Sequence, residues 1–156
     1  MNIKEISSVL FVCMGNICRS PSAEAVFRNK AQAQGLSLRI DSAGTVGAHV
    51  KEKPDHRAQK MGAERGYSFE GIKARKVLTQ DFEDFDLILA MDNANLEDLL
   101  KIAPEHLQSK AMLFLDFAEN HEENEVPDPY YGGANGFRYV LDLVEDASDG
   151  LLNRLN

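Results

Sequence analysis

The chain has 156 residues, of which 44% are hydrophobic and 27% charged, a composition typical of one globular domain. We therefore expect residues 1–156 to form a single domain. The formal net charge of −8 argues against nucleic acid or an acidic membrane surface as a partner. No stretch approaches the roughly 18–20 apolar residues of a membrane-spanning helix, so no membrane partner is expected.

Cys13 and Cys18 are the two cysteines of the chain. A secreted disulfide framework needs more cysteines, and a structural zinc site needs about four Cys or His ligands in recognisable pairs. Two thiols in a chain of this size indicate a reducing compartment, so we expect a cytoplasmic protein.

Four short apolar runs are predicted to be strands, at residues 9–12, 38–40, 87–91 and 111–115. Most are continuous apolar blocks rather than alternating ones, as in parallel strands that are covered on both faces. Apolar residues recur at helical spacing in the segments that separate or follow them, at residues 23–31, 58–65, 96–100 and 137–151.

Residues at the ends of these helical segments support the assignment. Gly35 and Gly66 follow the first two segments as helix stops, Asp92 can cap the third, and Pro104 ends it. The alternation of strands and helices predicts an α/β fold with an open, doubly wound, four-stranded parallel sheet and helices on both faces.

A loop from Cys13 to Pro21 joins the first strand to the first helix. In such a sheet, ligands gather at the carboxyl ends of the strands, where helix N-termini point outward. Successive backbone N–H groups and the helix dipole favour an anion there. Pro21 suits the first helical turn, and Gly15 allows a backbone conformation that other residues avoid. We therefore expect a phosphate-binding loop after strand 1, which would focus positive charge locally in an acidic chain.

Within this loop, the sulfur of Cys13 would face the ring of amides. These amides and Arg19 favour the thiolate over the thiol, and Arg19 can offer phosphate oxygens a planar, two-pronged donor. The alternative is a buried structural cysteine beside a surface arginine. Asn16 could fix the loop backbone and Ser20 could donate to the sulfur, although either could be a turn residue or a helix cap.

The longest irregular stretch covers residues 116–133. It holds six acidic residues between Asp116 and Asp128, with no Lys or Arg, and closes on the sequence Asp-Pro-Tyr-Tyr at residues 128–131. Long loops in compact domains are often functional, although residues 122–125 can also be a solvated acidic segment.

These features resemble the low-molecular-weight protein tyrosine phosphatases. The resemblance rests on the Cys-x5-Arg-Ser-Pro loop at residues 13–21 and on the distant Asp-Pro-Tyr-Tyr sequence. Similar segments lie in the family's order at residues 41–45, 54–58, 73–75 and 91–96, and together they cover nearly the whole chain.

The resemblance implies hydrolysis of protein phosphotyrosine through a phosphocysteine intermediate. Cys13 would be the nucleophile, Arg19 the phosphate clamp, and Asp128 the acid that protonates the leaving oxygen and then activates water. The alternative for Asp128 is a turn residue between two prolines. The residues implied in phosphate or substrate binding are Met14, Gly15, Asn16, Ile17, Cys18, Ser20, Tyr130 and Tyr131.

Tyr130 and Tyr131 would line the substrate cleft, where rings can sandwich a phenyl group; packing under the loop is the competing role. No metal or organic cofactor is implied. The expected partners are phosphotyrosine-containing proteins, inorganic phosphate and oxyanion inhibitors, with the chain a monomer or weak homodimer. Cys18 could also form a reversible disulfide with Cys13 under peroxide and so protect it from over-oxidation, or simply be a small buried residue.

Two positions depart from the family pattern. Residues 46–50 lack the Trp that lines the cleft in many members, although His49 could partly fill the space. Ile72 stands where many members carry a His that supports the phosphate loop. The hydrogen-bond support for Asn16 and Ser20 must therefore differ.

Other functions fit the sequence less well. Arsenate reductases of this fold relay a disulfide through further cysteines, and none follows Cys18. Protein-arginine phosphatases tend to carry Thr at the position of Ile17. Cys-phosphorylated sugar-transport components generally lack the loop Arg and the distant Asp-Pro pair. A module that only binds phosphotyrosine would keep Arg19 but could dispense with Cys13 and Asp128.

Overall fold

The computed structural model describes residues 2–130 and 132–155. The strands are β1 Ser8–Cys13, β2 Arg39–Gly44, β3 Leu87–Ala90 and β4 Ala111–Leu113. The α-helices are α1 Arg19–Ala33, α2 His56–Glu64, α3 Asp81–Asp84, α4 Asn93–Ile102 and α5 Ala134–Leu155. Short 3-10 helices lie at Ile3–Glu5, Glu105–Lys110 and Phe114–Phe117.

The strands form one parallel sheet in the order β2-β1-β3-β4. β1 is central and buried along its whole length. Because the chain adds β2 on one side of β1 and β3 on the other, the strand order reverses between β1 and β3. In open α/β sheets the ligand crevice lies beyond the carboxyl ends of the strands at this point. The predicted fold class is therefore confirmed, and it locates the region in which a site is expected.

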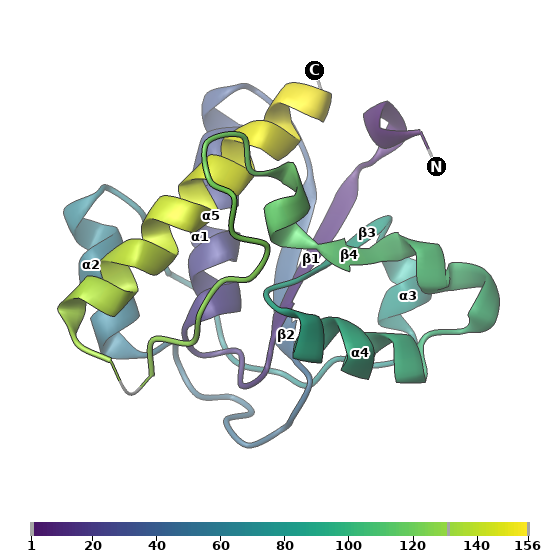
Figure 1. Cartoon of the computed structure of the whole chain (residues 1–156), viewed down its shortest axis with the longest axis horizontal. Helices are drawn as coiled ribbons and strands as arrows, with labels where there is room; N and C mark the ends of the chain where they lie inside the picture. Colours follow the sequence, from purple (N-terminus) through teal and green to yellow (C-terminus); the bar gives the residue numbers. More distant parts are fainter. Residues whose placement is uncertain (1, 131, 156) are drawn as a thin grey trace.

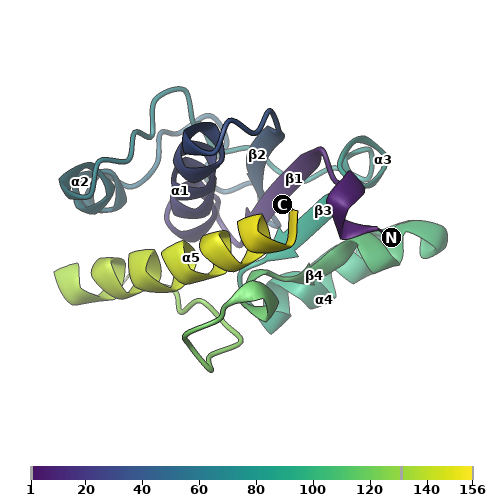
Figure 2. The same ribbon diagram turned by 90° about the horizontal axis from the view of Figure 1, so that it is seen from above.

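Helices cover both faces of the sheet (Figure 1, Figure 2). Val9, Phe11 and Cys13 of β1 belong to the apolar cluster shared with α1, α2 and α5. Leu10 and Val12 belong to the cluster on the other face, which includes residues of α3 and α4. This alternation follows from the two-residue repeat of a strand. It also places the side chain of Cys13 on the face covered by α1.

The helix boundaries follow the residues that predicted them. The side chain of Asp92 accepts a hydrogen bond of 2.7 Å from the backbone N–H of Asn95 and so caps α4. Gly35 and Gly66, which follow α1 and α2, have φ angles of 72° and 87°. Only glycine reaches this left-handed region at no steric cost. No helix in the described part of the chain is both long and apolar enough to cross a membrane.

Some boundaries differ from the prediction. β2 continues to Gly44 rather than ending at residue 40, because polar residues inside it, such as Ser42, have buried partners that the sequence does not reveal. β4 ends at Leu113, where a 3-10 helix begins. The short α3 was not predicted; the carboxylate of Asp81 accepts a hydrogen bond of 2.7 Å from the N–H of Leu78 in the turn that leads into it.

Candidate active site

The loop of residues 14–18 joins β1 to α1 at the carboxyl end of the sheet. Cys13 ends β1 and is buried. Its Sγ lies 3.0 Å from the hydroxyl oxygen of Ser20 and accepts a hydrogen bond of 3.3 Å from the backbone N–H of Asn16. The sulfur therefore lies between a loop amide and a hydroxyl on the first turn of α1.

The side-chain amide of Asn16 fixes the direction of this hydrogen bonding. Its Oδ1 accepts from the backbone N–H of Arg75 at 3.0 Å. Its Nδ2 consequently donates both other bonds, to Ser20 Oγ at 2.8 Å and to Ser42 Oγ at 3.0 Å. Because Ser20 accepts from Asn16, its own proton is available for the sulfur of Cys13. The sulfur thus has two neighbouring hydrogen-bond donors, a loop amide and this hydroxyl.

Asn16 is also the loop residue with a left-handed backbone, at a φ of 58°. The prediction that Gly15 supplies the unusual conformation is wrong, because the hydrogen bonds of the Asn16 amide hold that residue in the strained region instead. Gly15 serves by having no side chain. A Cβ there would lie 3.1 Å from Cδ2 of His49, so the glycine allows the imidazole to approach the loop.

A buried carboxyl extends this network behind the loop. The hydroxyl of Ser42 donates a hydrogen bond of 2.6 Å to Oε1 of Glu24, whose residue is 6% exposed. Burial raises the pKa of Glu24 to about 7, although the hydrogen bond from Ser42 opposes this shift. Ile72 packs in the apolar core. The loop is thus supported by Ser42, Glu24 and the backbone of Arg75, with no polar contribution from the side chain at position 72.

Arg19 begins α1 and is 4% exposed. Its Nη1 donates to Oδ2 of Asp92 at 2.7 Å and to the carbonyl oxygen of Val126 at 3.1 Å. Burial alone would lower the pKa of Arg19, but the nearby Cys13 and the hydrogen-bonded Asp92 outweigh it and raise the pKa above its usual value. The guanidinium is therefore a fixed cation in a polar site that is mostly shielded from solvent.

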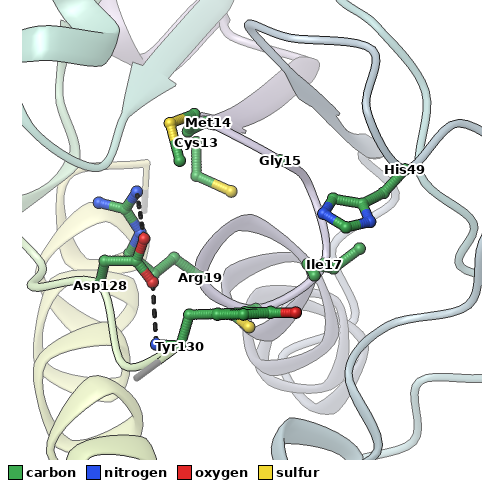
Figure 3. Close-up of a pocket in the computed structure, with 9 residues that line it drawn as sticks. Cys13, Met14, Gly15, Ile17, Arg19, His49, Asp128 and Tyr130 are labelled. Atoms are coloured by element: carbon green, nitrogen blue, oxygen red, sulfur yellow. Dashed lines mark hydrogen bonds and ion pairs between the residues drawn. The ribbon is translucent and has the colours of Figure 1, made fainter. Parts of the chain in front are cut away.

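Asp128 comes from the long loop before α5, and its side chain is 41% exposed. Its Oδ1 accepts a hydrogen bond of 3.0 Å from the N–H of Tyr130, and its Oδ2 lies 3.9 Å from Nη2 of Arg19. The carboxylate thus faces the guanidinium across the site while one edge remains open to a ligand (Figure 3).

A cavity of about 200 Å³ brings these groups together. Its lining residues are Cys13, Met14, Gly15, Ile17, Cys18, Arg19, His49, Asp128 and Tyr130. Asn16 and Ser20 are fully buried and are not among these lining residues. In Figure 3, Asp128 lies on one side of the cavity and His49 on the other. Tyr131, predicted to line the cleft, lies outside the described residues.

Asp55 and Arg57 connect the phosphate loop to the loop that carries Asp128. The N–H of Asp55 donates to the carbonyl oxygen of Ile17 at 2.7 Å. Two nitrogens of Arg57 donate to the carboxylate of Asp55 at 3.1 and 3.0 Å, and Nη2 also donates to the carbonyl oxygen of Tyr130 at 2.9 Å. We call this pair the loop clasp. It ties the segment two residues beyond Asp128 to the phosphate loop.

Cys18 lines the cavity and is buried, with its thiol free like that of Cys13. Burial, followed by the negative charge of Asp55, raises the pKa of Cys18 to about 12. The thiol of Cys18 is therefore protonated at neutral pH.

Several of these contacts were not predicted from the sequence. Asp92 was expected only as a helix cap, although its place at the end of β3, beside β1, is a signal for a site residue. Glu24 and Ser42 lie inside a helix and a strand, and the sequence has no motif that joins them. The Asp-x-Arg spacing of the loop clasp is visible in the sequence, but its partner Tyr130 lies 73 positions from Arg57.

The chain matches a family described as low molecular weight phosphotyrosine protein phosphatase over residues 8–156. It is 47% identical over 150 residues to the low molecular weight phosphotyrosine protein phosphatase of Schizosaccharomyces pombe, which covers 94% of this chain and 96% of that protein.

Solved structures agree with this match. A protein tyrosine phosphatase from Entamoeba histolytica with Hepes in the active site is 45% identical, with a TM-score of 0.92 over 95% of this chain and 96% of that chain. The tyrosine phosphatase Wzb from Escherichia coli K30, in complex with sulphate, is 30% identical, with a TM-score of 0.84 over 97% and 99% of the two chains. This chain therefore belongs to the low molecular weight phosphotyrosine protein phosphatase family and is a protein tyrosine phosphatase.

Proposed function

We propose that the chain hydrolyses phosphotyrosine in proteins through a phosphocysteine formed on Cys13. The observation that carries this proposal is the position of the Cys13 sulfur. It accepts from one loop amide, lies 3.0 Å from a hydroxyl oxygen, and shares a cavity with Arg19 and Asp128. A thiolate, a fixed cation and an exposed carboxyl are the groups that a two-step displacement at phosphorus requires.

In the first step, Sγ of Cys13 attacks phosphorus and the bond between phosphorus and the tyrosine oxygen breaks. Asp128, protonated at that moment, gives its proton to the leaving phenolate. Arg19 and the N–H groups of residues 14–18 hold the other phosphate oxygens. The ion pair with Asp92 keeps the guanidinium in one orientation, so little orientational freedom is lost when the phosphate binds.

In the second step, Asp128 removes a proton from a water molecule that attacks phosphorus, and the sulfur–phosphorus bond breaks. The sulfur leaves as a thiolate, which the hydroxyl of Ser20 stabilises by donating its proton, because the sulfur at 3.0 Å is a nearer acceptor than the carbonyl oxygen of Ala43 at 3.5 Å. The products are inorganic phosphate and the unmodified enzyme. All the groups used are side chains or amides of the described residues, and the proposed reaction calls for no cofactor.

The ligands of the relatives support a site for tetrahedral anions. One relative holds sulphate and another has Hepes, a sulfonate, in its active site. We propose that inorganic phosphate and related oxyanions inhibit this chain by occupying the same loop, and that phosphotyrosine proteins are its substrates, with residues 1–156 acting as a single domain. The free thiols suit a cytoplasmic setting.

We propose a redox role for Cys18 as well. When peroxide converts Cys13 to its sulfenic acid, the sulfur of Cys18 attacks it, and the two residues form a disulfide with release of water. A thiol reductant would restore both thiols. The two cysteines line one cavity, which supports this proposal.

The test is steady-state hydrolysis of phosphotyrosine, phosphoserine and phosphoarginine peptides, with the Cys13→Ser protein as the control. We expect turnover of phosphotyrosine alone and none by Cys13→Ser, which should still bind phosphate. Rapid quenching should trap phosphate on the wild-type chain in the iodine-labile form expected of a phosphothiolate. Full activity of Cys13→Ser, or preferred hydrolysis of phosphoarginine, would refute the proposal.

A further inference from the structure

A second hollow lies beside the catalytic cavity, between the end of β2 and the C-terminal half of α4. Its volume is about 550 Å³. Its lining includes apolar and charged side chains, those of Val46, Lys76, Leu78, Asp98, Lys101 and Ile102. We call it the α4 groove. Val46, Leu78 and Ile102 are exposed, and Leu78 is 58% exposed, so the groove presents apolar surface to solvent.

The α4 groove and the catalytic cavity are linked by one backbone hydrogen bond between residues that line them. The N–H of Val46 donates to the carbonyl oxygen of Met14 at 3.0 Å. Met14 lines the catalytic cavity and is 49% exposed. An exposed apolar side chain of the cavity, Met14, and one of the groove, Val46, thus belong to hydrogen-bonded neighbouring segments. Exposed apolar patches of this kind mark interaction sites, and a substrate protein held at the cavity must extend over its rim.

The groove also carries positive charge at its edge. Lys76 and Lys101 line it, and the acidic residue among its described lining is Asp98, whose Oδ1 lies 3.9 Å from Nζ of Lys101. Asp128 lines the catalytic cavity, and the carboxylate of Glu125 accepts a hydrogen bond of 2.8 Å from the N–H of Asn93 at the start of α4. A peptide bound along the groove therefore meets two lysines, in a chain of net charge −8.

The floor of the groove is built on the sheet rather than on a free loop. Residues 75 and 77 pair with Gly44 at the end of β2, through N–H to carbonyl bonds of 2.8 Å in each direction. The side chain of Arg75 is held by carboxylates of Asp41 and Asp81 at 3.1 and 3.0 Å. A preformed floor reduces the ordering cost of binding.

We propose that the α4 groove binds the segment of the substrate protein next to its phosphotyrosine, and selects apolar and acidic side chains there. This proposal rests on the proposed function and adds its substrate preference. An apolar substrate side chain would lie against Val46, Leu78 and Ile102, and an acidic one against Lys76 or Lys101. Affinity from the groove lowers KM for such peptides and leaves small aryl phosphates unaffected.

The test compares wild type with the Leu78→Ser/Ile102→Ser double variant on three substrates. These are p-nitrophenyl phosphate, a phosphotyrosine peptide with apolar and acidic flanks, and one with alanine flanks. We expect about a tenfold loss of kcat/KM on the first peptide, through KM, because apolar contact area is lost. The kcat/KM values for p-nitrophenyl phosphate and for the peptide with alanine flanks should be unchanged. Leu155→Ser, at the far end of α5, is the matched control for any general loss of stability.

Charge is tested separately with Lys101→Gln, and with Lys60→Gln on α2 as its control. Only Lys101→Gln should weaken binding of the peptide with apolar and acidic flanks, and the difference between the two variants should shrink at high salt. Equal losses on p-nitrophenyl phosphate and on the peptides would overturn the proposal, as would no loss on any peptide. A wild-type dimer that Leu78→Ser dissociates would assign the groove to a second copy and also overturn it.

A measurement of peptide binding distinguishes a failure of the groove proposal from a failure of the proposed catalytic mechanism. Peptide affinity is measured by calorimetry in the Cys13→Ser background, where no turnover is expected. If the groove variants bind the apolar and acidic peptide as tightly as their parent, the groove proposal fails while Cys13 catalysis stands. If Cys13→Ser turns over substrate, the chemistry fails while the affinity difference can still be read from KM.

Discussion

The guanidinium of Arg19 donates a hydrogen bond of 2.7 Å to the carboxylate of Asp92, and this ion pair spans the two strand ends at which the sheet order reverses. Arg19 follows the loop after β1, whereas Asp92 follows β3 directly. Asp92 therefore has two partners, since it also caps α4 through its bond to the N–H of Asn95.

The two roles of Asp92 can be separated. Asparagine is as good a helix cap as aspartate, so Asp92→Asn should keep the cap but lose the charge-assisted bond to Arg19. We expect kcat/KM to fall at least about tenfold. Asp92→Ala should show the same loss and be further destabilised by about 1 kcal/mol. Phosphatase assays and urea unfolding of both variants check this. Wild-type activity in Asp92→Asn would mean that the ion pair does not orient Arg19.

Removing the carboxyl of Asp128 should slow the reaction most for poor leaving groups. Good phenolate leaving groups need little protonation, so Asp128→Ala should lose about 10²–10⁴-fold on phosphotyrosine and much less on activated aryl phosphates. A series of aryl phosphates with different phenol pKa values measures this dependence. A uniform loss across the series would contradict the acid role.

Loosening the loop clasp should give a weaker form of the dependence on leaving group that we expect for Asp128→Ala. Arg57→Met removes the bonds to Asp55 and to the carbonyl of Tyr130, so Asp128 should be less well positioned. We expect a loss confined to poor leaving groups, with unchanged inhibition by phosphate, because the phosphate loop keeps its own supports. Arg57→Lys retains the charge and should recover part of the activity.

The clasp is distinguished from a purely structural ion pair by the leaving-group series. If Arg57→Met loses stability yet responds to leaving-group pKa as wild type does, then Arg57 does not position Asp128.

Glu24 should make stability fall as pH rises. Its pKa is about 7 in the folded protein, against an ordinary value of 4.5. Between these values the folded state binds the extra proton, so the free energy of unfolding decreases with pH. From pH 5 to 8, Glu24→Gln should gain about 2.5 kcal/mol relative to wild type.

Urea unfolding at both pH values tests the effect of Glu24, with Glu97→Gln on the exposed face of α4 as the control. A wild-type stability that rises with pH relative to Glu24→Gln would show that the carboxyl is stabilised in its charged form.

Disulfide formation between Cys13 and Cys18 should accelerate with pH. The attacking species is the thiolate of Cys18, which is scarce at neutral pH because burial raises its pKa to about 12. We expect the rate after a peroxide pulse to rise about tenfold per pH unit between pH 7 and 9, and to be absent in Cys18→Ser. Mass spectrometry of the trapped products measures it. A pH-independent rate would exclude this thiolate as the attacking group.

The sequence predicts those parts of the site that depend on neighbours along the chain. The spacing of Cys13 and Arg19 places both on one turn between a strand and a helix, and Pro21 marks where that helix starts. The four-stranded parallel sheet with helices on both faces follows from the same alternation of elements, but the order of its strands does not. In contrast, the ion pair between Arg19 and Asp92 joins residues 73 positions apart, and no local pattern predicts such a pair.

Polar residues inside regular elements were the other source of error. Ser42 interrupts the apolar pattern of β2, so the strand was predicted to end too early. Glu24 faces the protein interior from α1, where a charged residue is expected to face solvent. The burial of Ser42 and that of Glu24 explain one another, because the hydrogen bond between them compensates the loss of water for both side chains.

The left-handed backbone of Asn16 has a consequence for how anions are chosen. A side chain in this conformation costs roughly 1–2 kcal/mol, and the folded chain bears that cost before any substrate arrives. Because the side chain of Asn16 binds Ser20, Ser42 and the backbone of Arg75, we expect the loop amides to be oriented before an anion binds, so that tetrahedral ions must fit their spacing. Anions of similar charge but different bond length should then differ in inhibition constant more than their hydration alone would suggest.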